Sequence, residues 1–113
     1  GSPVPFNPSI SCIVERVTHL PGITRGNDYH FHTKTALRQG QIVVDFPREN
    51  RTVKLGGRDF DVLFIQYRLP QLTTDQEQYT TITKGHALTF ITSYTTPEDQ
   101  ALMNKALETV VFR

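Results

Sequence analysis

The sequence predicts an α+β domain in which helices pack on a mainly antiparallel sheet of about four to six strands, in the manner of an α/β/α sandwich. Three observations lead to this prediction. Extended segments rich in β-branched residues recur along the chain, as is typical of strands. Short turns at Gly56-Gly57 and Lys84-Gly85 join neighbouring segments, and such turns connect antiparallel strands. The chain then closes with apolar residues at helical spacing after Thr96-Pro97.

The chain is predicted to contain a linker followed by one domain. Residues 1–8 carry three prolines, and proline lacks the N–H that a sheet ladder needs. We therefore interpret these residues as a linker that includes a tag remnant, Gly1-Ser2. The domain would span residues 9–113, a length that suits a single hydrophobic core. Its first strand is predicted over residues 9–18, which are β-branched and alternate loosely.

A turn at Pro21-Gly22 separates this strand from a predicted helix. The helix would be capped by Thr24 or Asn27 and would run to about Gln39, before Gly40. Its apolar positions fit helical spacing imperfectly, and the expected stripe consists of Tyr29, Phe31, Ala36 and Leu37.

The middle of the chain is predicted to form three strands. Residues 41–46 read as a strand that Pro47 interrupts, and residues 51–55 resume the extended pattern. Residues 59–69 give the strongest strand signal, because both of its faces are apolar in the middle. Such a strand is expected to be central and covered on both sides. One face carries Phe60, Val62 and Phe64, and the other carries Leu63, Ile65 and Tyr67.

The C-terminal part is predicted to form a hairpin and a helix. Residues 70–76 read as a polar loop, and residues 78–83 and 86–94 read as two strands. The last helix is expected over residues 97–109, with Thr96 as its N-cap and two acidic residues in its first turn. It is expected to pack on the sheet through Leu102, Ala106 and Val110.

Composition and charge narrow the classes of function. Twelve Lys and Arg residues balance eleven Asp and Glu residues, for a net charge of +1, and the basic residues are scattered. This pattern argues against nucleic-acid binding, which usually requires a basic patch. No run of ~18 apolar residues is present, so no integral membrane segment is expected. The single cysteine forms no disulfide within the chain, and it leaves cytoplasm and periplasm or lumen equally open.

Few residues suggest chemistry. His30 and His32 would share a face on a strand but diverge on a helix, and without further ligands we expect both to lie on the surface and bind no metal. Cys12 is expected to be a buried, unreactive thiol in the middle of a strand. Asp59 and Asp61 would share a strand face, and we interpret them as a solvated strand end rather than an acid–base pair. No catalytic residue and no cofactor are therefore predicted.

The order of elements in the C-terminal two thirds resembles a known family. The pattern is carried by Val53 to Gly57, Lys84-Gly85, Leu88 to Phe90, Thr96 to Asp99, and Val110 to Phe112. It resembles the PsbP-like and DcrB-like α/β/α sandwich family over about residues 41–112. That family usually opens with a hairpin that ends in a Pro-Gly-Trp-like turn, and this chain has no tryptophan. The resemblance therefore implies either that this chain begins late within the family's domain, which would be truncated at its N-terminus, or that only the fold is shared.

The resemblance implies a non-enzymatic protein. Members of the family act as accessory subunits of membrane complexes, as periplasmic or lumenal lipoproteins, and as chaperones for hydrophobic helices of secreted effectors. On this basis we expect an accessory or chaperone-like domain that binds a protein or apolar peptide. The sheet face not covered by the last helix is the expected binding side. Its candidate residues are Leu63, Ile65 and Tyr67, which could form either a core or a binding surface.

Two other functions stay open at this point. The first is a small-molecule or lipid pocket, with or without enzymatic activity, lined by Phe64, Phe90 and Tyr94 with Asp61 or His86 as its polar group. The second is an interaction module of a longer secreted protein, since a proline-rich segment often links domains. A homodimer or a domain swap is also compatible with the sequence, because a truncated first hairpin would leave a sheet edge unpaired.

Overall fold

The computed structural model describes residues 9–109, which form six strands and two helices. All strand pairs are antiparallel, and both helices pack on the sheet, so the predicted α+β class is confirmed. No helix in these residues is long and apolar enough to cross a membrane. In chain order the elements are β1 (Ser9–Arg16), α1 (Gly26–Arg38), β2 (Val43–Asp45), β3 (Arg51–Leu55), β4 (Arg58–Arg68), β5 (Thr73–Thr83), β6 (His86–Tyr94) and α2 (Pro97–Leu107).

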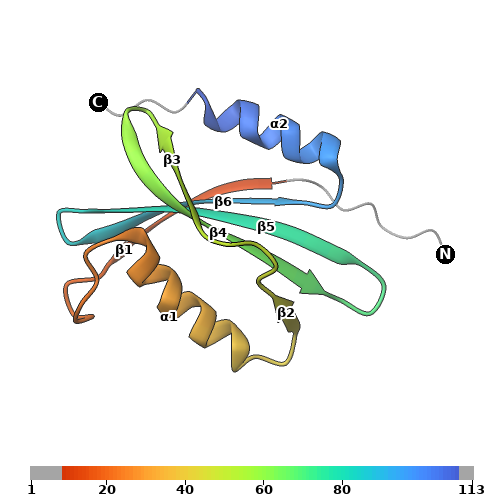
Figure 1. The fold of residues 1–113 in the computed structure, drawn as a ribbon, viewed down its shortest axis with the longest axis horizontal. Helices are drawn as coiled ribbons and strands as arrows, with labels where there is room; N and C mark the ends of the chain where they lie inside the picture. Colours follow the sequence, from red (N-terminus) through yellow and green to blue (C-terminus); the bar gives the residue numbers. More distant parts are fainter. Residues whose placement is uncertain (1–8, 110–113) are drawn as a thin grey trace.

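The sheet runs in the order β1-β6-β5-β4-β2, and β3 also pairs with β4. The strand β1 therefore forms one edge, whereas the two short strands β2 and β3 share the other edge along different parts of β4. Figure 1 shows α1 and α2 on opposite sides of the sheet. We call the two sides of the sheet the α1 face and the α2 face.

Two hairpin turns lie where the sequence predicts them, at Gly56-Gly57 and at Lys84-Gly85. Gly56 and Gly57 have φ angles of 56° and 81°, and Lys84 and Gly85 have φ angles of 50° and 75°. Two successive residues with positive φ form the turn that suits the twist of an antiparallel hairpin. The bounds of β6, His86–Tyr94, are those predicted.

The predicted polar loop over residues 70–76 is wrong in its second half, because β5 already begins at Thr73. Polar side chains pair across the two strands there. Gln66 donates to Asp75 at 3.2 Å, and the Tyr67 hydroxyl donates to Gln76 at 3.0 Å. Cross-strand pairs of this kind stabilise a sheet without apolar alternation, so hydropathy alone does not reveal them.

The helix α1 packs on the sheet through a different side from the one predicted. Gly26 and His30 are the buried residues of α1, whereas Phe31 is 69% exposed and Ala36 is also exposed. The predicted start and end of the helix are correct within a few residues. Beneath α1 lie Leu63 and Ile65 of β4, both fully buried.

The α2 face holds the main apolar cluster. It comprises side chains from β3, β4, β5 and α2, namely Leu55, Phe60, Val62, Tyr79 and Leu107. The helix α2 begins as predicted, with the Thr96 hydroxyl accepting from the Asp99 N–H at 3.2 Å. It packs through Met103 and Leu107, so the predicted contacts through Leu102 and Ala106 are wrong, since both are exposed. The third predicted contact, Val110, lies outside the described residues.

Candidate functional site

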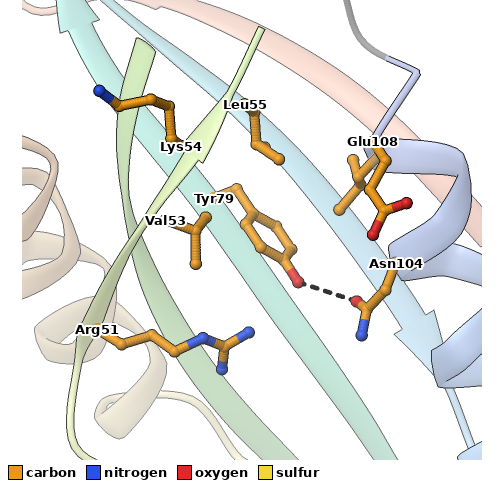
Figure 2. Close-up of a pocket in the computed structure, with 8 residues that line it drawn as sticks. Arg51, Val53, Lys54, Leu55, Tyr79, Asn104 and Glu108 are labelled. Carbon is orange, nitrogen blue, oxygen red and sulfur yellow. Dashed lines mark hydrogen bonds between the residues drawn. The ribbon is translucent and has the colours of Figure 1, made fainter. Parts of the chain in front are cut away.

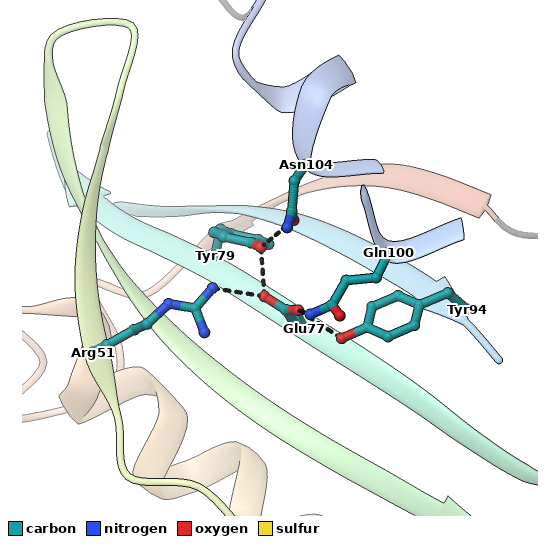
Figure 3. Close-up of polar contacts among 6 residues, drawn as sticks. All are labelled: Arg51, Glu77, Tyr79, Tyr94, Gln100 and Asn104. Carbon is teal, nitrogen blue, oxygen red and sulfur yellow. Dashed lines mark hydrogen bonds and ion pairs between the residues drawn. The ribbon is translucent and has the colours of Figure 1, made fainter. Parts of the chain in front are cut away.

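The most organised polar group in the structure is a fully buried carboxylate on the α2 face. Glu77 of β5 is 0% exposed, and it accepts hydrogen bonds from four side chains (Figure 3). These are Tyr79 at 2.5 Å, Tyr94 at 2.6 Å, Gln100 at 2.9 Å and Arg51 at 2.9 Å. We call Glu77 and these four donors the Glu77 network.

The fold explains how these side chains meet. Glu77 and Tyr79 are two residues apart on β5, so both point to the α2 face. Gln100 and Asn104 are four residues apart on α2 and lie over the same strand. The Tyr79 hydroxyl also contacts the Asn104 Oδ1 atom, at 3.3 Å. The network therefore ties α2 and β3 to the centre of the sheet.

The electrostatics of the network keep Glu77 charged. Burial acts to raise the pKa of Glu77, but the hydrogen bonds from Tyr79, Tyr94 and Gln100 and the charge of Arg51 together lower it below its ordinary value. Burial and the neighbouring Glu77 raise the pKa values of Tyr79 and Tyr94, so both hydroxyls stay protonated. A carboxylate that is charged, saturated with donors and shielded from solvent is suited to hold structure rather than to exchange protons.

A cavity of about 260 Å³ lies beside this network, between β3 and α2 (Figure 2). Arg51 reaches into it from β3, and Asn104 reaches into it from α2. Its lining combines these two polar groups with apolar walls and two charged residues: Arg51, Val53, Lys54, Leu55, Tyr79, Asn104, Leu107 and Glu108.

The α1 face has its own buried polar chain. His30 Nε2 lies 2.9 Å from the Thr80 hydroxyl, which in turn lies 2.8 Å from the Thr89 hydroxyl. His30 is 0% exposed, and its Nδ1 atom has no hydrogen-bond partner within residues 9–109. Burial lowers the pKa of His30 to about 4, against a smaller opposing effect of Asp61, and Lys34 lowers it further. The imidazole is therefore neutral at neutral pH.

We expect acid to destabilise the protein through His30. Because the folded pKa of about 4 lies below the unfolded value of 6.5, protons favour the unfolded chain as the pH falls between these two values. The full effect is about 3 kcal/mol, reached near pH 4. Denaturant unfolding of wild type and of His30→Gln at a series of pH values measures it. The variant should lack this decline, whereas His32→Gln, at an exposed position on the same helix, should keep it. A parallel decline in wild type and His30→Gln would contradict the assignment.

The two histidines considered as metal ligands, His30 and His32, lie in different environments. His30 is buried, which corrects the expected surface position, and His32 is exposed on another side of α1. Within residues 9–109, no group of three or more His, Cys, Asp or Glu side chains is arranged to hold a metal ion. Cys12 is exposed rather than buried, because β1 is an edge strand that no helix covers closely.

The predicted binding residues lie beneath a helix. Leu63 and Ile65 are 0% exposed under α1, and Tyr67 is half-buried with its hydroxyl bonded to Gln76. The sheet face that was expected to be open is thus covered by α1. Of the two roles left open for these residues, the structure places Leu63 and Ile65 in the core.

The three aromatic residues of the predicted pocket share a face of the sheet, but neither of its predicted polar groups joins them. Phe64 and Tyr94 are buried on the α2 face, and Phe90 packs there against Phe60 with ring centroids 5.9 Å apart. Asp61 points to the opposite face, and His86 is exposed beside the turn, with Nδ1 3.0 Å from the Lys84 carbonyl. Asp61 is separated from Phe64 because odd-numbered and even-numbered residues of β4 face opposite sides of the sheet.

Asp61 instead anchors the start of α1. Its Oδ2 atom accepts from the Asn27 N–H at 2.9 Å, and its Oδ1 atom accepts from the Thr52 hydroxyl at 2.9 Å. The carboxylate thereby satisfies a free backbone N–H at the positive end of the helix. Asp59 lies at an exposed position in an ion pair with Lys54 at 3.8 Å, as expected for a solvated strand end, whereas Asp61 is buried, which corrects the predicted solvated position of Asp61.

More exposed apolar residues lie on β1 than on any other strand of the described sheet. All eight of its residues are exposed, including Ile10 at 39%, Ile13 at 47% and Val14 at 64%. Within residues 9–109, no strand pairs with its outer edge. The backbone groups on that edge are therefore available for hydrogen bonding.

Comparisons with known proteins address the fold. No family model matches this sequence, and no curated protein matches it either. The structure is similar to that of PA94, a Pseudomonas aeruginosa protein described as of unknown function and a candidate regulator, with a TM-score of 0.64. The two sequences are 14% identical, and the match covers 96% of this chain and 85% of the other. At this identity the similarity shows the fold alone, an α+β domain with helices on an antiparallel sheet.

Proposed function

We propose that this protein is a non-enzymatic, chaperone-like accessory domain that binds an extended segment of a partner protein along the outer edge of β1. The observation that carries the proposal is the edge itself. It extends over eight residues and is exposed along its whole length. An added strand would hydrogen-bond to its unpaired N–H and C=O groups, as in other cases of recognition by strand addition.

The edge lacks the features that usually prevent pairing. Natural edge strands are short, carry inward-pointing charges or proline, or contain bulges. In β1 the register with β6 continues without a bulge from Ser9 to Arg16, and the charged residues lie only at its end. The opposite edge, in contrast, consists of the short strands β2 and β3. A selective binding role for β1 accounts for this difference.

The two faces of β1 define the chemistry of the partner segment. Its register with β6 puts Ile10, Cys12 and Val14 on the α2 face. The α1 face of β1 carries two serines, Ile13 and Glu15, and the Glu15 carboxylate accepts from the Tyr29 hydroxyl of α1. A segment added beside β1 would best alternate apolar residues on the α2 face with mainly polar residues on the α1 face.

The helix α2 extends this apolar surface. Leu102 is 57% exposed, and it lies about 200° around the helix from Asn104, which lines the cavity beside β3. Leu102 therefore faces the β1 side of the sheet. Apolar side chains of the added segment would bury Leu102 together with Ile10 and Val14, and burial of such side chains stabilises a complex.

Two matched valine variants test the proposal. Val14→Lys places a charge on the β1 edge, whereas Val43→Lys makes the same change at an exposed valine of β2. We expect Val14→Lys to reduce by at least tenfold the amount of partner that co-purifies with the protein from the cells that produce it. Val43→Lys should retain the partner.

The stability of both variants is measured first, by denaturant unfolding, and should match wild type because both positions are exposed. Equal partner recovery by Val14→Lys and wild type would rule out the β1 edge. A wild-type protein that purifies alone, or as a self-associated dimer in native mass spectrometry, would contradict a separate partner.

A further inference from the structure

We propose that the cavity between β3 and α2 binds a small monocarboxylate, with its carboxylate against Arg51 and Asn104 and a short apolar chain against Val53, Leu55 and Leu107. This site is separate from the β1 edge, because β1 and β3 lie at opposite sides of the sheet. It therefore stands independently of the proposed partner binding.

Arg51 is held in place before any ligand arrives. Its Nη2 atom lies 2.9 Å from Glu77, whose side chain is 0% exposed, whereas the Arg51 side chain itself is 44% exposed. The Glu77 network fixes this carboxylate, so the guanidinium has a fixed partner on its buried side. Further N–H groups of the guanidinium stay available on the cavity side. An arginine with a planar fork of donors matches a carboxylate in two-point geometry.

Asn104 supplies a second hydrogen-bond donor beside the cavity. Its Oδ1 atom contacts the Tyr79 hydroxyl, which assigns the amide nitrogen to the other side of the group. Figure 2 shows the Arg51 guanidinium and the Asn104 amide on either side of the Tyr79 hydroxyl. Two donor groups from different elements, β3 and α2, therefore flank one part of the cavity, as expected for an acceptor ligand.

The remaining lining and the size of the cavity favour a ligand with a short apolar chain. Val53 and Leu55 on β3 and Leu107 on α2 form apolar walls beside these donors. A ligand that carries only charge would leave these walls in contact with water, whereas a short aliphatic chain would cover them. The volume of about 260 Å³ is below the range typical of drug-sized ligands, so it favours a small molecule.

Charges at the rim favour a single negative group on the ligand. Lys54 and Glu108 also line the cavity, but the Lys54 ammonium is paired with Asp59 at 3.8 Å, so the negative charge of Glu108 would repel a second carboxylate on the ligand. A dicarboxylate is therefore disfavoured, and a monocarboxylate with an uncharged tail fits the arrangement of groups.

Titration with butanoate, hexanoate and octanoate tests the proposal directly. Backbone amide signals of the isotope-labelled protein are followed by NMR, with hexanol as the probe of equal chain length that lacks a carboxylate. We expect at least one of these acids to shift the amides of Arg51, Val53, Asn104 and Leu107 with saturation. Hexanol should bind at least tenfold more weakly. Absence of saturable shifts with all three acids, or equal binding of hexanol, would overturn the proposal.

Three variants locate the site. Asn104→Ala and Arg51→Lys should each weaken binding by about tenfold, and Val53→Phe should block it by filling the cavity while leaving every charge in place. Arg38→Lys, the same type of change at an exposed position of α1, is the matched control and should bind as wild type. Because Asn104 is exposed, its alanine variant should fold normally even if Arg51→Lys loosens the Glu77 network. Shifts that spread over scattered surface cations and persist in Val53→Phe would show nonspecific binding and overturn the proposal.

Discussion

Replacing Glu77 with glutamine is expected to lower the free energy of unfolding by about 3 kcal/mol, because one partner of a buried ion pair is removed. The four groups around Glu77 all donate hydrogen bonds. A glutamine side chain would bring an NH2 group, itself a donor, into a site that offers too few acceptors. The remaining charge on Arg51 would lose its buried partner, although its partial exposure moderates that loss.

Denaturant unfolding at neutral pH measures this effect, with Glu49→Gln at an exposed loop position as the control. The control should differ from wild type by less than about 0.5 kcal/mol. The sign of the pH dependence provides a second check. Because the folded pKa of Glu77 is lowered, its stabilisation is present above the ordinary value of 4.5 and is lost as the pH falls through the lower folded value. A loss below about 1 kcal/mol for Glu77→Gln would show that the network contributes little to stability.

Replacing Gly26 with alanine is expected to destabilise the protein by about 2 kcal/mol, although alanine is normally the better helix former. A Cβ atom at this position would lie 2.3 Å from the Thr80 carbonyl oxygen and 2.9 Å from the Asp61 Cβ atom. The first contact is with backbone, so α1 would have to move away from β5. That movement would weaken the contact between Asn27 and Asp61 and the contact between His30 and Thr80.

Thermal or denaturant unfolding of Gly26→Ala measures this effect, and Gly40→Ala is a matched control. A Cβ atom at Gly40 would meet nothing closer than 3.4 Å, which is an ordinary contact. We expect the control to keep wild-type stability within about 0.5 kcal/mol. A Gly26→Ala protein as stable as the control would show that α1 does not need its close approach to the sheet.

Much of the fold could be predicted because local signals agreed with it. The Gly56-Gly57 pair and the Lys84-Gly85 turn place two hairpins, and Thr96-Pro97 places the start of α2. The faces of the two helices could not be predicted in the same way. In α1 the buried stripe starts with Gly26 and His30, which hydropathy does not mark as apolar, and the phenylalanine next to His30 is exposed.

The Glu77 network was missed because Glu77 lies between the predicted loop, residues 70–76, and the predicted strand, residues 78–83. A signal was nevertheless present, since Glu77 and Tyr79 are two residues apart and therefore share a face of β5. The partners of Glu77 come from three other elements, and their convergence depends on the sheet order and on the side of α2 that faces the sheet. Neither can be derived from one sequence. The predicted binding residues Leu63 and Ile65 do not form a surface, because α1 covers the face of the sheet that carries them.

An unpaired sheet edge was expected from the sequence only in general terms, and the structure assigns it to β1. The sequence predicted a strand at residues 9–18 and allowed an unpaired edge, but it could not tell which strand would lie outermost. The structure puts β1 at the edge, with exposed apolar residues on both of its faces. The proposed binding of a partner segment requires this position of β1.

The most direct test of binding at the β1 edge is hydrogen exchange of the β1 amides. Exchange is compared between the free protein and its complex with the co-purifying partner. In the free protein, alternate amides of β1 bond to β6 and exchange slowly, whereas those directed outward should exchange rapidly. We predict that the outward amides become at least tenfold slower in the complex, as an added strand requires. Unchanged exchange along β1, with new protection confined to another surface, would contradict binding at this edge.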